Sequence, residues 1–141
     1  MKGDATVFVV DDDPSILRAM TRALVAADWR VEAFSSAYFL LQRSRYDGLG
    51  CVVADLRMPG MDGVTLLYLV RQAAPNTVRV LLTGKADLEA ATAAINEGNI
   101  FRLLNKPCPT GTLLRALEAA VEQYRLTTGA ALNPSEVKPH V

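Results

Sequence analysis

Short apolar runs rich in β-branched residues recur along this chain, and each is followed by a longer segment whose apolar residues lie three or four positions apart. The first run, Thr6–Val10, ends in the acidic triplet Asp11–Asp13, after which Ile16, Met20 and Leu24 recur at helical spacing. Buried strands and amphipathic helices give these two patterns. The predicted strands are Thr6–Val10, Val31–Phe34, Cys51–Ala54, Val78–Leu82 and Ile100–Leu104. The predicted helices run from Pro14 to about Ala27, around Tyr38–Leu41, from Val64 to about Ala73, from Ala86 to Glu97, and from about Thr110 to Leu126.

The strict alternation of strands and helices predicts the fold class. Parallel strands need crossover connections, which helices usually supply. We therefore expect an α/β fold, a single doubly wound (βα)5 domain with a parallel five-stranded sheet covered on both faces. Residues 127–141 hold two prolines and show no apolar periodicity. They are predicted to be a flexible tail or a truncated linker to a missing effector domain.

The overall composition excludes some functions. The 141 residues include 15 Lys and Arg against 15 Asp and Glu, so the formal net charge is zero. Proteins that neutralise nucleic-acid phosphates usually have a basic excess, so direct nucleic-acid binding is not expected. The longest uncharged apolar stretch, Val64–Val70, is far shorter than the ~20 residues of a membrane-spanning helix. With two cysteines and no apolar leader after Met1, a cytoplasmic location without membrane attachment is predicted.

Polar residues collect where the predicted strands end. Asp11 and Asp12 follow the first strand, Asp55 the third, Thr83 the fourth, and Lys106 the fifth. In open α/β sheets, ligands bind outside the carboxyl ends of the strands. Each residue alone is ordinary in such a loop, but several carboxylates brought close together repel one another unless a cation or a shared proton balances them. An all-oxygen acidic site suits Mg²⁺, so a magnesium site that acts on phosphoryl groups is indicated.

Four segments carry a resemblance to a known family. The sequences around Val9–Asp13, Asp55–Gly63, Leu82–Gly84 and Asn105–Pro107 resemble, in order and at family-like spacing, the CheY-like receiver domain of two-component response regulators. The resemblance covers about residues 5–126. It implies a flavodoxin-like sheet of order 2-1-3-4-5 and a regulatory phosphoacceptor domain, an enzyme only toward its own phosphorylation and dephosphorylation.

The resemblance also implies a role for each site residue. Asp55 is expected to be the phosphoacceptor, taking its phosphoryl group from a sensor histidine kinase or a phosphotransfer protein. Mg²⁺ (or Mn²⁺) is expected to bind Asp12, Asp55 and the backbone carbonyl of Arg57 directly, and Asp11 through water. Asp13 is assigned to capping the following helix instead.

Further residues are expected to carry the switch. The resemblance implies that Lys106 pairs with the acceptor carboxylate and then with the phosphoryl oxygens. Thr83 is expected to move toward the phosphoryl group and donate a hydrogen bond. A cis peptide usually precedes the proline at position 107 in this family, although the sequence alone permits either isomer.

The chain also departs from the usual receiver pattern. Receivers often have Tyr or Phe three residues before the lysine, where Leu103 stands here, and the aromatic residue is Phe101 instead. The usual coupling between the threonine and an aromatic ring is therefore in doubt. Arg57 and Lys85 occupy two variable positions that flank the acceptor and are expected to modulate the lifetime of the phosphoryl group.

Output and partners are implied only in outline. The family's usual signalling face would combine the helix at 86–97, the fifth strand and the last helix, and it would control an output domain or partner or form a homodimer on phosphorylation. The Ala-rich helix at 86–97 is either lightly anchored for that purpose or simply rich in a good helix former.

Two other classes remain open at this stage. The Asp-x-Asp within Asp11–Asp13 resembles the nucleophile motif of haloacid-dehalogenase-like phosphatases. The chain is alternatively a binding module that works without phosphorylation, although the acidic residues together with Thr83 and Lys106 argue against this.

Overall fold

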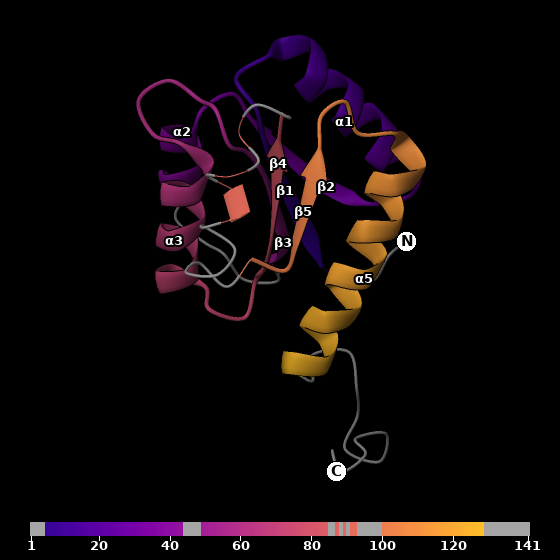
Figure 1. The fold of residues 1–141 in the computed structure, drawn as a ribbon. Helices are drawn as coiled ribbons and strands as arrows, with labels where there is room; N and C mark the ends of the chain where they lie inside the picture. Colours follow the sequence, from indigo (N-terminus) through magenta and orange to yellow (C-terminus); the bar gives the residue numbers. More distant parts are fainter. Residues whose placement is uncertain are drawn as a thin grey trace, which may run out of the picture.

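The computed structural model describes residues 5–43, 49–84, 87, 89, 91, 92 and 100–128. Its strands are β1 (Thr6–Val10), β2 (Arg30–Phe34), β3 (Leu49–Asp55), β4 (Val78–Thr83) and β5 (Arg102–Asn105). All neighbouring strands pair in parallel, in the order β2-β1-β3-β4-β5 (Figure 1). The predicted doubly wound, flavodoxin-like fold is confirmed.

The helices cover both faces of this sheet. They are α1 (Pro14–Ala26), α2 (Ala37–Leu41), α3 (Gly63–Ala73) and α5 (Thr110–Thr128). Helices α1 and α5 lie on one face, and α2 and α3 on the other (Figure 1). No helix within the described parts of the chain is both long and apolar enough to cross a lipid bilayer.

Several predicted boundaries differ from the structure by one or two residues, and the third strand begins at Leu49 and not at Cys51. The fifth strand begins at Arg102, which pairs with Val80, and not at Ile100, which is buried on the α2 and α3 side. The last helix continues two residues beyond Leu126. The predicted helix at 86–97 lies mostly outside the described residues, as does the predicted tail from residue 129 onward.

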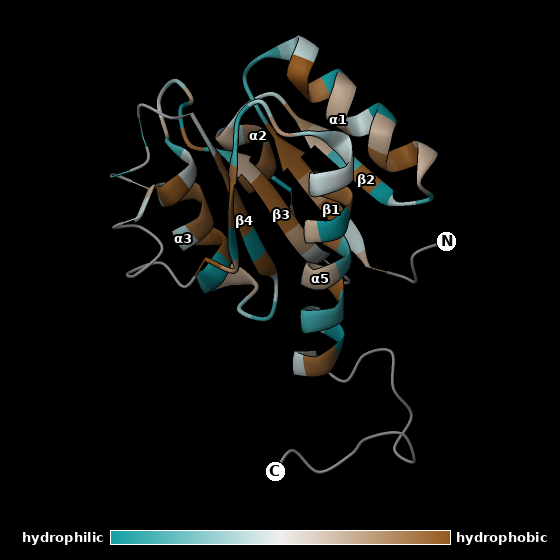
Figure 2. Ribbon diagram, turned by 45° about the vertical axis from the view of Figure 1, so that its right-hand side comes forward, coloured by the Kyte–Doolittle hydropathy of each residue, from teal (hydrophilic) through white to brown (hydrophobic). Residues whose placement is uncertain are grey.

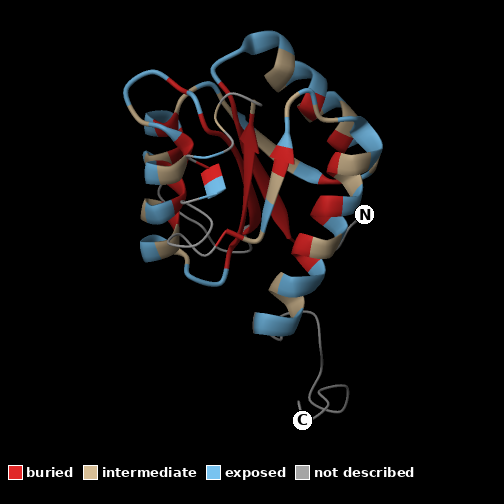
Figure 3. Cartoon of the chain, in the orientation of Figure 1, coloured by how far each residue is buried: buried red, intermediate tan, exposed pale blue. Residues whose placement is uncertain are grey.

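Strand β1 shows why its sequence is apolar throughout. All five of its residues are buried, because helices cover the sheet on both sides (Figure 3). Val7 and Val9 pack on the α1 and α5 side, whereas Phe8 and Val10 pack on the α2 and α3 side. In Figure 2 the central strands are mostly brown, the colour of hydrophobic residues. Parallel sheets buried on both faces read as near-continuous apolar runs for this reason.

Helix caps fix where the chain turns after the strands. The Asp13 carboxylate accepts hydrogen bonds from the N–H groups of Ser15 and Ile16, and Pro14 occupies the first helical turn. Ser36 caps α2 and Asp62 caps α3 in the same way. The predicted capping role of Asp13 is confirmed. These caps stabilise helix starts beside the carboxyl ends of the strands.

Candidate functional site

The first part of the site is a cluster of three carboxylates. Asp11 directly follows β1 and Asp55 ends β3, and these two strands are neighbours in the sheet. One carboxylate oxygen from each of Asp11, Asp12 and Asp55 lies within 4.8 Å of the others. Asp11 and Asp55 are buried, whereas Asp12 is exposed. The structure therefore brings together the three acidic residues that the sequence placed at strand ends.

Close packing of Gly63 against the end of β3 supports this position of Asp55. Gly63, the first residue of α3, donates its N–H to the Leu56 carbonyl at 2.9 Å. A Cβ at position 63 would come within 2.3 Å of the Asp55 carbonyl oxygen. Only glycine allows the start of α3 to approach the end of β3 this closely.

Lys106 joins the acidic cluster from the loop after β5, the edge strand next to β4. Its Nζ lies 2.9 Å from Asp11 Oδ2 and 3.0 Å from Asp55 Oδ2. The Lys106 N–H also donates to the Thr83 carbonyl at 2.8 Å, which ties the loop after β5 to the end of β4. The Lys106–Pro107 peptide bond is cis, as the family resemblance implies. The ammonium therefore bridges two of the three carboxylates.

Burial and charge shift the pKa values of the paired groups. Burial raises the pKa of the Asp55 carboxyl, and the nearby Asp11 carboxylate adds to the rise. The hydrogen bond and charge of Lys106, together with the Arg57 N–H at 3.4 Å, only partly oppose this. Burial alone would lower the pKa of Lys106, but its hydrogen bonds to Asp11 and Asp55 outweigh burial, and the pKa is raised. Among the described residues, the ammonium of Lys106 pairs with two of the three carboxylates, so the cluster carries an excess of acidic groups.

The donor set of the cluster fits a divalent cation. Its ligand atoms are carboxylate oxygens, and Asp12 faces solvent, so water can complete the coordination shell. Mg²⁺ prefers one or two carboxylates together with water and phosphate oxygens. Asp11, Asp12 and Asp55 are the residues that could hold such an ion. The Arg57 N–H donates a hydrogen bond to Asp55 Oδ1. Binding of the metal ion by the Arg57 carbonyl stays a prediction.

Thr83 lies at the end of β4 with its side chain fully buried. Its hydroxyl donates to the carbonyl of the next residue, Gly84, at 3.1 Å. The hydroxyl proton is therefore engaged within its own loop.

The two candidate switch residues, Leu103 in β5 and Phe101 just before it, lie on opposite faces of the sheet. Leu103 packs against the core on the α2 and α3 side, whereas Phe101 packs against the core on the α1 and α5 side. Phe101 donates its N–H to Arg79, four residues before Thr83 on β4. The structure therefore places Phe101 away from the site. Lys85, the other modulating candidate, lies outside the described residues.

A contact that the sequence did not reveal joins two loops of the site. Arg57 Nη2 lies 2.5 Å from Asp87 Oδ1. The two residues are 30 positions apart, so spacing along the chain gave no signal for this pair. The predicted flanking residue Arg57 is therefore held by a carboxylate from the segment after β4.

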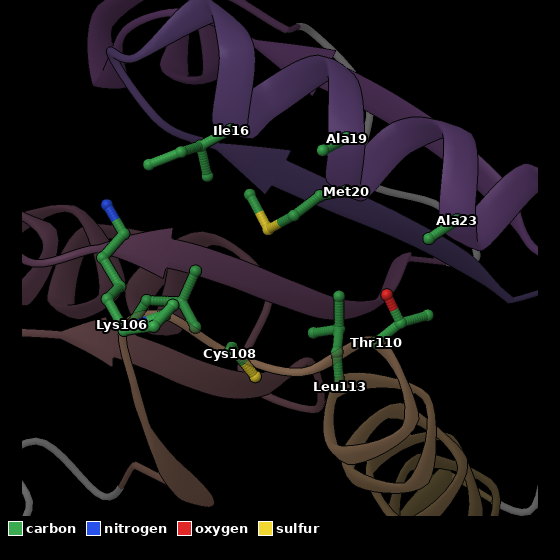
Figure 4. Close-up of a pocket in the computed structure, with 10 residues that line it drawn as sticks. Ile16, Ala19, Met20, Ala23, Lys106, Cys108, Thr110 and Leu113 are labelled. Atoms are coloured by element: carbon green, nitrogen blue, oxygen red, sulfur yellow. The ribbon is translucent and has the colours of Figure 1, made fainter.

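An apolar cavity of about 220 Å³ lies beside the site, between α1 and the start of α5. Met20, Leu82, Leu113 and the aliphatic part of Lys106 contribute to its lining. Figure 4 shows the Lys106 nitrogen directed away from Leu113 and Cys108. The stem of Lys106 therefore lines the cavity, while its ammonium pairs with Asp11 and Asp55.

Comparisons with known proteins agree with this geometry. The family model for the response regulator receiver domain matches residues 7–118. A crystal structure of a response regulator receiver domain protein from Clostridium thermocellum superposes with a TM-score of 0.81 at 27% identity, covering 88% of this chain and 99% of that one. The chain belongs to the response regulator receiver domain family.

Sequence relatives point to two-component response regulators. The chain is 34% identical to the C4-dicarboxylate transport transcriptional regulatory protein DctD of Rhizobium meliloti, over 89% of this chain and 27% of that protein. It is 34% identical to the DNA-binding transcriptional regulator NtrC of Escherichia coli, over 84% of this chain and 25% of that protein. The chain thus spans about a quarter of the length of these relatives and corresponds to a receiver domain related to theirs.

Proposed function

We propose that this receiver domain accepts a phosphoryl group on Asp55 from a phosphohistidine of a sensor histidine kinase or phosphotransfer protein, in a reaction that needs Mg²⁺ or Mn²⁺. One observation carries the proposal. Asp55 ends β3 with its carboxylate shared between Lys106 and an acidic cluster that fits a divalent cation. An ordinary structural aspartate would not need both neighbours.

Different residues of the chain have different roles in this phosphoryl transfer. A carboxylate oxygen of Asp55 attacks phosphorus as the phosphorus–nitrogen bond of the donor breaks, and the imidazole leaves with the bonding electron pair. Lys106 moves from the Asp55 carboxylate to the phosphoryl oxygens, where its positive charge offsets developing negative charge. Asp11, Asp12 and Asp55 would hold the metal ion, which when bound neutralises charge on the phosphoryl oxygens.

The response to phosphorylation starts at Thr83. The new group adds about 1.5 to 2 negative charges and three acceptor oxygens. Thr83 exchanges its bond to the Gly84 carbonyl for one to a phosphoryl oxygen, which moves the loop after β4. Lys106 is hydrogen-bonded to Thr83 through the backbone, so the loops after β4 and β5 respond together.

The output face lies on the β5 and α5 side of the domain. The last turns of α5 extend beyond the sheet (Figures 1 and 2), and Leu126 there is half exposed. We propose that residues 5–126 form the receiver domain and that residues 127–141, of which the first two continue α5, are a tail or a linker to an effector domain or partner. The relatives DctD and NtrC are named as transcriptional regulators, so a regulator of transcription is the favoured output.

The geometry gives no support to a phosphatase of the Asp-x-Asp type. In such a motif the second aspartate would serve the reaction, whereas the Asp13 carboxylate caps α1. Hence we propose a phosphoacceptor rather than an enzyme acting on external esters.

Labelling of the acceptor tests the proposal. The protein is incubated with Mg²⁺ and radioactive acetyl phosphate, and the bound label is measured after acid quenching. Wild type and Asp28→Asn, an exchange of the same kind at an exposed turn with φ of 67°, should both be labelled. Asp55→Asn should not be labelled, and omission of Mg²⁺ should abolish labelling. An unlabelled wild type, or an Asp55→Asn variant labelled as strongly as wild type, would overturn the proposal.

A further inference from the structure

An ion pair connects the loop that follows Asp55 with the segment that follows Thr83. Arg57 lies two residues after Asp55, and Asp87 lies four residues after Thr83. Their side chains meet at 2.5 Å. The Asp87 side chain is 16% exposed, compared with 73% for Arg57. The carboxylate is thus the anchored partner, and the guanidinium is the one that reaches across from solvent.

Both partners are also fixed through the backbone. The Arg57 N–H donates to Asp55 Oδ1 at 3.4 Å. The Asp87 N–H donates to the Gly84 carbonyl at 3.1 Å, in the turn that follows Thr83. The ion pair therefore links the acceptor's loop directly to the loop of the threonine.

The electrostatics of the pair agree with its geometry. The hydrogen bond from Arg57 lowers the pKa of the Asp87 carboxyl, and the same hydrogen bond raises the pKa of the guanidinium. The nearby Asp62 carboxylate acts in the same direction on Arg57. Arg57 is therefore charged, and Asp87 competes for it with any other anion that forms near Asp55.

We propose that Asp87 is a positioning residue that holds the Arg57 guanidinium away from the acceptor until a phosphoryl group takes the guanidinium over. This inference rests on the function proposed above. A phosphoryl group on Asp55 offers more charge and more acceptor oxygens than one carboxylate, and arginine binds such groups through paired hydrogen bonds. Transfer of the guanidinium to the phosphoryl oxygens releases Asp87, and the loop after β4 loses a tie to the loop after β3.

The expected effect is modest because the guanidinium is solvent-exposed. Exposed ion pairs contribute little, and breaking this one would strengthen phosphoryl binding about two- to fivefold. The direction of the effect is the informative part. Removing the Asp87 charge should favour the phosphorylated state, and removing the Arg57 charge should disfavour it.

The test measures binding of beryllium fluoride, a phosphoryl mimic, in the presence of Mg²⁺ by titration calorimetry. Asp87→Asn should bind about two- to fivefold more tightly than wild type, and Arg57→Gln should bind more weakly. In the double variant the benefit of Asp87→Asn should disappear, because no guanidinium remains to be released. Glu89→Gln removes one negative charge from an exposed residue of the same segment and should match wild type.

The outcomes separate this inference from the function on which it rests. Absence of binding by wild type overturns the proposed phosphoacceptor and the role of Asp87 with it. Binding by wild type, with Asp87→Asn equal or weaker, overturns the role of Asp87 alone. The same holds if Glu89→Gln tightens binding as much as Asp87→Asn, or if Asp87→Asn keeps its full effect without Arg57, since the cause would then be general charge or loop structure. Urea unfolding of each variant verifies that it is folded.

Discussion

The Asp55 carboxyl lies in a place that disfavours its charged form. Its side chain is 7% exposed, and burial together with the Asp11 carboxylate raises its pKa despite the neighbouring ammonium. If Asp55 is the phosphoacceptor, as proposed, these surroundings favour the reaction, because the carboxylate exchanges an unfavourable charged state for a covalent bond to phosphorus. The same surroundings reduce the stability of the fold at neutral pH. Function and stability therefore oppose each other at this one residue.

The destabilising effect of the Asp55 charge should depend on pH. A carboxyl whose pKa is higher in the folded state binds its proton more tightly there than in the unfolded chain. The fold therefore loses stability as the pH rises from the ordinary pKa of 3.8 to values above the raised pKa of the folded state. Asp55→Asn removes this loss. Without Mg²⁺ we expect it to be more stable than wild type at pH 7 by ~1 kcal/mol, a typical size for one substitution, with the difference closing near pH 3.5.

Urea unfolding at the two pH values measures this difference. Asp28→Asn, at an exposed position, should show no such change between the two pH values. An Asp55→Asn variant that is less stable than wild type at pH 7 would show that the bond to Lys106 outweighs the burial of the charge.

Helix α5 determines the stability of one whole face of the sheet. Leu113, Ala116, Leu117, Ala120 and Val121 are buried against it. Their spacing of three and four residues was visible in the sequence as a helical stripe. The same helix presents Leu126 to solvent, with 48% of its surface exposed. One helix thus offers a buried and an exposed leucine for direct comparison.

Truncating each leucine should separate packing from exposure. Leu117→Ala removes a fully buried side chain and should lower the free energy of unfolding by about 2 to 5 kcal/mol through lost burial and the cavity left behind. Leu126→Ala should change it by less than about 0.5 kcal/mol. Thermal and urea unfolding give both values. Similar losses for the two variants would mean that α5 does not pack as described.

The sequence predicted elements well and contacts between loops poorly, for physical reasons. Apolar runs and helical stripes are local, so β1 and α5 could be read from a few neighbouring residues. Asp11 and Asp55 could be expected to meet because parallel strands end at the same edge. The Arg57–Asp87 pair depends on rotamers of two side chains far apart in the chain. Phe101 lies before β5, so the alternation of side chains along a strand does not determine which face it packs on.

At the scale of the whole molecule, the net charge of zero hides an uneven distribution. Asp11, Asp12 and Asp55 gather at one edge of the sheet with Lys106 bridging two of them. The unbalanced negative charge is concentrated there, where the loops after β1, β3 and β5 meet. A cation bound at this place would strengthen contacts among all three loops and so stabilise the domain as a unit.

Mg²⁺ should therefore raise the stability of the entire domain. A ligand that binds only the folded state at ten times its dissociation constant adds ~1.4 kcal/mol, which corresponds to a rise of about 3 to 6 °C in the melting temperature of a domain of this size. Asp12→Asn should lose most of this rise, because it removes an exposed ligand without disturbing the buried core. Differential scanning calorimetry with and without Mg²⁺, compared with NaCl at equal ionic strength, measures the shift. A rise that NaCl reproduces, or that Asp12→Asn retains in full, would show that general charge screening rather than a built metal site links these loops, since screening does not require any one carboxylate.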